Sequence, residues 1–186
     1  MNYGYNNYED YQEEAEWADM RGALAQRGYT FNEVEWERVR DLLYAGEISG
    51  GVDFDFVTDR IATGGAVYGP ADVDTLIAAG ITHIATMAAE ITAETDAFIA
   101  GRVPHLQNGV GDDGVWKPAT WFKRTLDFCL DALKDPNAKC YISCGAGINR
   151  GPSGAYVVLR AFYGWSSEET TKAINEARPI TRRGIA

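Results

Sequence analysis

The stretch that decides the fold runs from Lys139 to Arg160 and reads K-C-Y-I-S-C-G-A-G-I-N-R-G-P-S-G-A-Y-V-V-L-R. Its first part, Lys139 to Ser143, is rich in residues that favour β-structure and predicts a short buried strand. Gly151-Pro152 then opens a helix, because proline is favoured in the first helical turn. The apolar residues from Ala155 to Tyr163 continue this helix. The segment between them is therefore a glycine-rich loop that leads from a strand into the N-terminus of a helix.

The residues of this loop are suited to holding an anion. Between Cys144 and Arg150 stand five small or neutral residues, Gly145, Ala146, Gly147, Ile148 and Asn149. Such residues let the backbone N–H groups turn inward on a phosphate, which the helix dipole also favours. The planar guanidinium of Arg150 can hold two phosphate oxygens at once. The same positive field favours the thiolate of Cys144, and a thiolate is a nucleophile.

The string C-G-A-G-I-N-R-G resembles the signature loop of the cysteine-dependent dual-specificity and tyrosine phosphatases, H-C-x-x-G-x-x-R-S/T. The match is specific at Cys144, Gly147 and Arg150. Two positions depart from it, because Ser143 stands where the family usually has histidine and Gly151 where it usually has serine or threonine. The segments D-R-I-A-T-G-G and G-I-T-H-I-A-T-M-A-A-E, within residues 59–90, are also similar to bacterial-type members. The resemblance covers residues 52–179 and suggests a small bacterial or phage-like member.

The resemblance implies a role for each residue of the site. Cys144 attacks phosphorus, while Arg150 and the amides of residues 145–150 hold the phosphate oxygens. A carboxylic acid on a nearby loop protonates the leaving oxygen. Asp112 and Asp113, on a G-D-D-G turn 32 and 31 residues before Cys144, are the candidates. Asp112 gives the better ungapped match to the family and Asp113 is the alternative, although aspartate and glycine are also ordinary turn residues.

The two departures from the signature leave a second hypothesis open. In the resembled family, the histidine before the cysteine orients the loop, and the hydroxyl after the arginine assists departure of the thiolate. The Ser143 hydroxyl can still donate a hydrogen bond, and Ser153 lies close enough in sequence to replace the missing hydroxyl. Without such a substitute, the chain would be a pseudophosphatase, a phosphate-binding module that turns its ligand over slowly.

The resemblance also suggests the class of substrate. Phosphorylated proteins or peptides are expected, with phosphotyrosine first, while phosphoserine, phosphothreonine and phosphoinositides stay open. An RNA 5′-triphosphatase is a further alternative, because G-I-N-R-G also resembles the H-C-x-x-G-x-N-R-T-G loop of that branch. The formal net charge of −10 disfavours nucleic acids and anionic membranes as partners. No metal or cofactor is implied, and the oligomeric state is left open.

The composition is that of a single folded domain with an extension. The chain has 186 residues, of which 46% are hydrophobic, and no run of 18 apolar residues or signal peptide is recognised. The three cysteines, Cys129, Cys140 and Cys144, fit a reducing compartment, so a cytoplasmic protein is expected. His83 and His105 each stand alone in strand-like runs and are interpreted as core or surface residues.

The chain is divided into residues 1–12, a disordered tail; 13–50, a helical N-terminal extension; and 51–186, a phosphatase-like catalytic domain. Within the catalytic domain, strands are predicted near residues 52–57, 60–65, 81–87, 103–110 and 139–143. Helices are predicted for residues 70–79, 92–100, 118–134, 151–163 and 166–177. This alternation predicts an α/β fold with a central mixed, mostly parallel sheet flanked by helices, and the cysteine loop at the carboxyl edge of a central strand.

Overall fold

The computed structural model describes residues 52–89, 91–111 and 117–181. The chain divides into two compact units, Met1–Gly50 and Gly51–Ala186, and every described residue belongs to the second. The predicted tail and helical extension, residues 1–12 and 13–50, therefore lie outside the described residues. No helix of the described part is both long and apolar enough to span a lipid bilayer.

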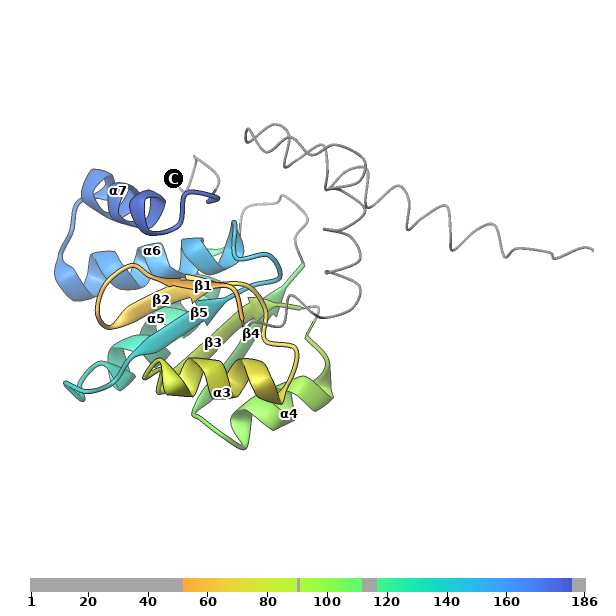
Figure 1. Ribbon diagram of the computed structural model, residues 1–186. Helices are drawn as coiled ribbons and strands as arrows, with labels where there is room; N and C mark the ends of the chain where they lie inside the picture. Colours follow the sequence, from red (N-terminus) through yellow and green to blue (C-terminus); the bar gives the residue numbers. More distant parts are fainter. Residues whose placement is uncertain (1–51, 90, 112–116, 182–186) are drawn as a thin grey trace, which may run out of the picture. The chain divides into compact units, whose positions relative to one another are not determined.

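A five-stranded sheet forms the centre of this unit (Figure 1). Its strand order is β1-β2-β5-β3-β4, with β1 antiparallel to β2 and all other neighbours parallel. This confirms the predicted mixed, mostly parallel sheet. The strands are β1 (Phe54–Phe56), β2 (Ile61–Gly64), β3 (His83–Ala88), β4 (His105–Val110) and β5 (Cys140–Ser143). The strand that precedes the cysteine loop, β5, is the central one.

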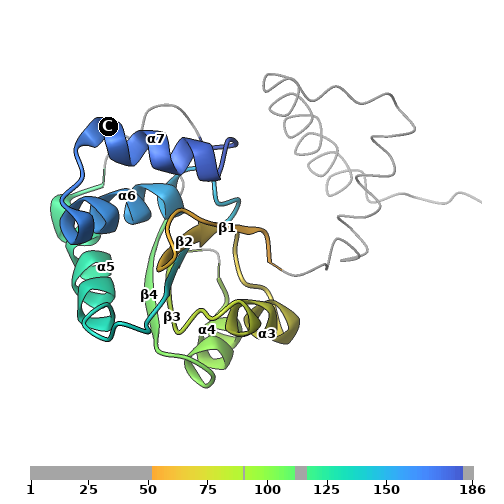
Figure 2. The same cartoon turned by 60° about the vertical axis from the view of Figure 1, so that its left-hand side comes forward.

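Helices cover both faces of the sheet, as Figures 1 and 2 show. One face carries α3 (Pro70–Ala78) and α4 (Ala93–Ala100). The other carries α5 (Ala119–Ala132) and α6 (Arg150–Tyr163), with α7 (Ser167–Ala177) packed on α6. All five predicted helices are present, with ends that differ by a few residues. In the helix predicted for residues 118–134, for example, Pro118 is the N-cap and Leu133 the C-cap.

The side chains of β5 alternate between two cores, as expected for a strand buried on both faces. Cys140 and Ile142 face the core under α5 and α6, while Tyr141 faces the core under α3 and α4. Every residue of β5 is buried. Burial on both sides fixes the strand firmly, so the loop that follows it starts from a rigid base.

The last helix begins at the predicted capping box. Ser166 accepts a hydrogen bond from the Glu169 N–H, and the Glu169 carboxylate accepts one from the Ser166 N–H. The buried residues Thr170 and Ile174 hold α7 on the domain. Its C-cap, Arg178, is also buried. The helix therefore ends with a charged side chain inside the protein.

Candidate active site

The loop of residues 144–149 connects the end of β5 to the start of α6. Cys144 is the first residue after the central strand and is 2% exposed. Its N–H donates to the carbonyl oxygen of Gly64 at 3.2 Å, and the loop continues with a bond from the Ala66 N–H to the Gly145 carbonyl oxygen at 2.9 Å. The end of β2 and the chain after it thus form one wall of the loop. The predicted position of the loop, at the carboxyl edge of a central strand, is confirmed.

Gly147 gives the loop its sharp turn. It has a φ of +64°, a left-handed conformation that favours glycine. A Cβ at this position would lie 2.3 Å from the carbonyl carbon of Gly64, so no side chain fits between the two backbones. The loop can therefore approach the end of β2 this closely because residue 147 has no side chain.

The inner face of the loop offers unpaired hydrogen-bond donors. Within the described residues, the backbone N–H groups of residues 145–148 donate to no protein acceptor. They precede the first turn of α6, where the helix dipole is positive. Donors of this kind at a helix N-terminus suit a phosphate group.

The Arg150 guanidinium is a permanent positive charge that is buried beside the loop. It is the first residue of α6 and is only 6% exposed. Its Nη1 donates to the carbonyl oxygen of Val110, the last residue of β4, at 2.7 Å. The guanidinium therefore reaches from the start of α6 to the end of β4. Val110 precedes Gly111, after which the two candidate acids follow in the sequence.

Arg178 holds the loop from its outer side, a role that no motif of the sequence predicts. The side chain is 1% exposed, and its Nε donates to the carbonyl oxygen of Gly147 at 2.7 Å. Nη2 donates to the carbonyl oxygen of Ala146 at 3.4 Å. In a trans peptide the C=O and the following N–H point in opposite directions. Holding these two carbonyls outward therefore turns the N–H groups of Gly147 and Ile148 toward the inside of the loop.

Two carboxylates from the first strand region balance the charge of Arg178. Nη1 donates to Asp55 at 2.6 Å and to Asp53 at 3.1 Å, and Nη2 also pairs with Asp53. Burial acts to lower the pKa of Arg178, but the hydrogen bonds and charges of Asp53 and Asp55 outweigh it and raise that pKa. The sequence did hold a signal for this pair. Acids at alternate positions of V-D-F-D-F share one strand face and call for a cationic partner.

Comparison with solved structures finds similar folds at low sequence identity. The human tyrosine phosphatase-like serine/threonine/tyrosine-interacting protein is 18% identical, with a TM-score of 0.61 over 70% of this chain and 87% of that one. Human DUSP28 is 19% identical, with a TM-score of 0.60 over 70% and 87%. PTPMT1 in complex with PI(5)P is 16% identical, with a TM-score of 0.59 over 69% and 85%. The chain has the fold of the tyrosine and dual-specificity phosphatases.

The resemblance stated from the loop sequence is thus confirmed for the phosphatase fold. Comparison of the sequence with protein-family models and with curated proteins finds no match. The bacterial or phage-like origin and the individual site roles stay predictions. In this phosphatase fold, the residues that the sequence places in one loop do meet at one edge of the sheet, together with Arg178.

The remaining predicted residues differ in what the structure describes of them. Ser143 is fully buried and its hydroxyl points to Thr86, with 3.4 Å between the two oxygen atoms. Ser153 lies on the first turn of α6, where its N–H donates to the Asn149 carbonyl oxygen at 2.9 Å. Asp112 and Asp113 lie outside the described residues.

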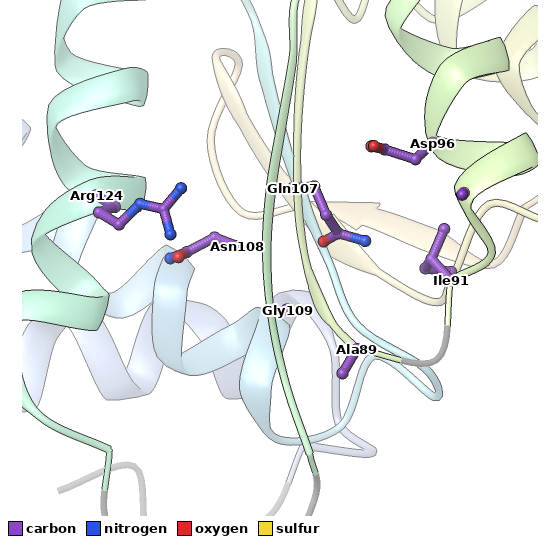
Figure 3. Close-up of a pocket in the computed structure, with 8 residues that line it drawn as sticks. Ala89, Ile91, Asp96, Gln107, Asn108, Gly109 and Arg124 are labelled. Carbon is purple, nitrogen blue, oxygen red and sulfur yellow. The ribbon is translucent and has the colours of Figure 1, made fainter.

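A separate cavity of about 410 Å³ lies along β4, the edge strand (Figure 3). Asn108 and Arg124 stand on one side of this strand, and Gln107, Asp96 and Ile91 on the other. No residue of the 144–150 loop lines it. The cavity is therefore separate from the loop of residues 144–149.

Proposed function

We propose that the protein hydrolyses phosphate monoesters through a cysteinyl-phosphate intermediate. The observation that carries this proposal is the pairing of a buried cysteine with the buried Arg150 and with loop N–H groups that have no acceptor among the described residues, all at the positive end of α6. A thiol next to such donors is suited to attack on a bound tetrahedral dianion, which supports the proposal.

In the first step, the Cys144 thiolate attacks phosphorus and forms an S–P bond while the P–O bond to the leaving group breaks. Asp112, or Asp113 in its place, gives its proton to the departing oxygen. Arg150 and the loop amides hold the three equatorial oxygens, whose charge they stabilise in the transition state. Because Arg178 fixes the loop carbonyls outward, these amides are oriented before the substrate arrives.

In the second step, water attacks phosphorus, the S–P bond breaks, and the thiolate leaves. The same aspartate, now a carboxylate, takes the proton from the attacking water, and inorganic phosphate is released. Gly151 offers no hydroxyl to the departing thiolate. We therefore expect this step to be the slower one.

We propose phosphorylated proteins or peptides as substrates, with phosphotyrosine preferred. The first supporting observation is the resemblance of the loop, and the second is the phosphatase fold that the chain shares with solved structures such as DUSP28 and PTPMT1. The PTPMT1 structure is described with PI(5)P bound, so phosphoinositides belong among the substrates to be tested. A panel of phosphopeptides, phosphoinositides and a 5′-triphosphate RNA separates these classes.

The decisive experiment is hydrolysis of p-nitrophenyl phosphate by the full chain with EDTA present. We expect turnover, inhibition by vanadate, and loss of activity in Cys144→Ser. Turnover that persists in this variant would remove Cys144 from the mechanism. Arg150→Lys should also be severely impaired, because a point charge does not reproduce the two-point grip of a planar guanidinium.

The alternative function is binding of a phosphorylated partner without appreciable turnover. Ser143 and Gly151 favour it, and one structural neighbour is described as a phosphatase-like interacting protein. A wild-type protein that binds a phosphotyrosine peptide as tightly as Cys144→Ser, and releases no phosphate, would establish this function instead.

A further inference from the structure

A row of hydrogen bonds runs through the sheet toward the nucleophile. Asp96 on α4 accepts from His105 Nδ1 at 2.8 Å. His105 Nε2 lies 2.9 Å from the Thr86 hydroxyl on β3. The Ser143 hydroxyl on β5 lies 3.4 Å from the same Thr86 oxygen. We call these residues the His105 chain, which ends at the residue bonded to Cys144.

The His105 chain is closed to solvent along most of its length. The His105 side chain is 1% exposed, Thr86 is 1% exposed and Ser143 is fully buried. Asp96 is 39% exposed and lines the cavity along β4, whereas His105 and Thr86 do not line it (Figure 3). Water therefore reaches the chain at its Asp96 end, and the hydroxyls within it have few competing partners.

The position of each residue follows from the sheet register. Thr86 and Ser143 are Cα partners on the parallel neighbours β3 and β5, so their side chains leave the same face of the sheet. His105 starts β4 on the other side of β3. The arrangement Asp96–His105–Thr86 resembles a hydrolytic triad, but its hydroxyl is buried against Ser143. No substrate can reach the Thr86 hydroxyl there. This hydroxyl therefore acts on the neighbouring Ser143 inside the protein.

The protonation state of His105 sets the direction of the hydroxyl groups. When His105 is neutral with its proton on Nδ1 toward Asp96, Nε2 accepts from Thr86, and Thr86 accepts from Ser143. When His105 is protonated, Nε2 donates to Thr86. The Thr86 hydroxyl must then turn its hydrogen toward Ser143, and the Ser143 hydrogen is released from the chain. The row of dipoles is reversed.

We propose that His105 is a positioning residue whose charge is coupled, through Thr86 and Ser143, to ionisation of the Cys144 thiol. A protonated His105 favours the thiolate, since both its positive charge and the reversed hydroxyl dipoles act on the end of β5. By reciprocity, the thiolate favours protonation of His105. The consequence for turnover rests on the proposed function, but the coupling itself is measured without turnover.

The groups that act on His105 are few. Burial lowers the pKa of His105, and the charge and hydrogen bonds of Asp96 from α4 oppose this change. β3 contributes the uncharged Thr86, and α5 packs on the opposite face of the sheet. Among the described residues, Asp96 is the only ionisable group whose charge is found to act on His105. A shift of the His105 pKa on changing Cys144 is therefore readily interpreted.

The experiment is an NMR titration of the histidine ring protons in the full chain. The sequence has two histidines, so His83→Gln assigns the signals. We expect Cys144→Ser to lower the His105 pKa by about 0.5 units relative to the wild type, because the thiolate is absent. Thr86→Val should abolish this difference, whereas Thr86→Ser, which keeps the hydroxyl, should preserve it.

Ser143→Ala breaks the same chain on another strand, so the test does not depend on the folding of one variant. Thr170→Val is the matched control, because it removes a buried hydroxyl on α7 that donates to the carbonyl oxygen of Ser166, the N-cap of the same helix. An equal His105 pKa in the wild type and Cys144→Ser would overturn the proposal. A response of His105 in a protein that does not turn over p-nitrophenyl phosphate would uphold the coupling and refute the proposed function. Turnover of p-nitrophenyl phosphate without a change in the His105 pKa would uphold the proposed function and refute the coupling.

Discussion

The Nε atom of Arg178 lies 2.7 Å from the carbonyl oxygen of Gly147, so a residue at the end of α7 fixes a peptide group of the loop that contains Cys144. This bond crosses 31 positions of the sequence. It has two separable effects, because the guanidinium stabilises the fold through Asp53 and orients the loop amides through Gly147.

Arg178→Met should reveal both effects. We expect the free energy of unfolding to fall by about 3 kcal/mol, because a buried charged partner of several groups is lost. Affinity for tungstate, a phosphate-shaped anion, should fall about tenfold as the loop loses preorganisation. Urea denaturation and calorimetry measure the two quantities. The control is Arg160→Met, an exposed position on α6. Unchanged tungstate affinity in a destabilised Arg178→Met would limit Arg178 to a role in stability.

Gly147→Ala should disable the loop, because its Cβ would meet Gly64 at 2.3 Å in addition to the strain of a positive φ. Gly164→Ala is the matched control. Gly164 has a φ of +71° at the C-cap of α6, but nothing lies within 4 Å of its added Cβ. We expect Gly164→Ala to cost about 1 kcal/mol and to keep tungstate binding, whereas Gly147→Ala loses it. Equal tungstate binding by both variants would show that the loop still binds the anion after it has moved away from β2.

Gly151 makes the second chemical step observable. Without a hydroxyl there, the cysteinyl-phosphate should accumulate, and rapid mixing should show a burst of nitrophenol near one equivalent, followed by slow turnover. A Cβ at this position would lie 3.1 Å from the Ile142 carbonyl oxygen and 3.2 Å from the Cys144 nitrogen, which is tight. Gly151→Ala therefore measures the steric effect alone. The additional effect of Gly151→Ser is that of the hydroxyl.

We expect Gly151→Ser to have a higher steady rate and a smaller burst than Gly151→Ala. A wild-type enzyme with brisk turnover and no burst would contradict this expectation. It would mean that Ser153, Ser143 or a water molecule already assists the departing thiolate.

The two candidate acids are separated by their dependence on the leaving group. Asp112→Asn should slow hydrolysis of alkyl phosphates by about 100-fold, and that of p-nitrophenyl phosphate far less, because nitrophenolate leaves without a proton. Asp113→Asn serves as the adjacent comparison and should have a small effect on both. The opposite ranking assigns the acid to Asp113, and indifference to both changes favours the binding function or a triphosphatase.

The stability of the protein should depend on pH through His105. Burial lowers the pKa of His105 from its ordinary value of 6.5, although Asp96 opposes this change. The unfolded chain then binds the proton more readily than the native state, so stability falls as the pH drops below 6.5 and through the lowered native pKa. For one titrating group, the free energy of unfolding cannot change by more than about 1.4 kcal/mol per pH unit.

Urea denaturation between pH 5 and pH 8 measures this slope, which His105→Gln should remove. His83→Gln is the comparison, since burial also lowers the pKa of His83, against the opposing charges of Asp135 and Asp131. Asp96→Asn removes the carboxylate that opposes the effect of burial, so the His105 pKa should fall further. The loss of stability should then extend over a wider pH range. An unchanged slope in His105→Gln would show that other groups govern it.

The sequence was informative where the determinants of structure are contiguous. The run from Lys139 to Tyr163 contains a strand, a loop and a helix start, so its placement at the edge of the central strand could be predicted from local rules. Arg178 could not be found in this way, because its partner Asp53 lies 125 positions away. The hydrogen bond between His105 and Thr86 likewise depends on the strand order, which an α/β pattern alone does not fix.

The contacts around Gly147 also determine when the loop can form. The backbone of Gly147 lies close to Gly64, and Gly64 lies close to the carbonyl group of Asp53. Arg178 contacts both the Asp53 carboxylate and the Gly147 carbonyl oxygen. This ring brings together the beginning and the end of the described domain. Closing such distant contacts carries the largest entropy cost, so the loop should reach its final shape late in folding. A nascent chain that has not yet emerged as far as Arg178 would contain Cys144 and Arg150 but would not yet bind phosphate.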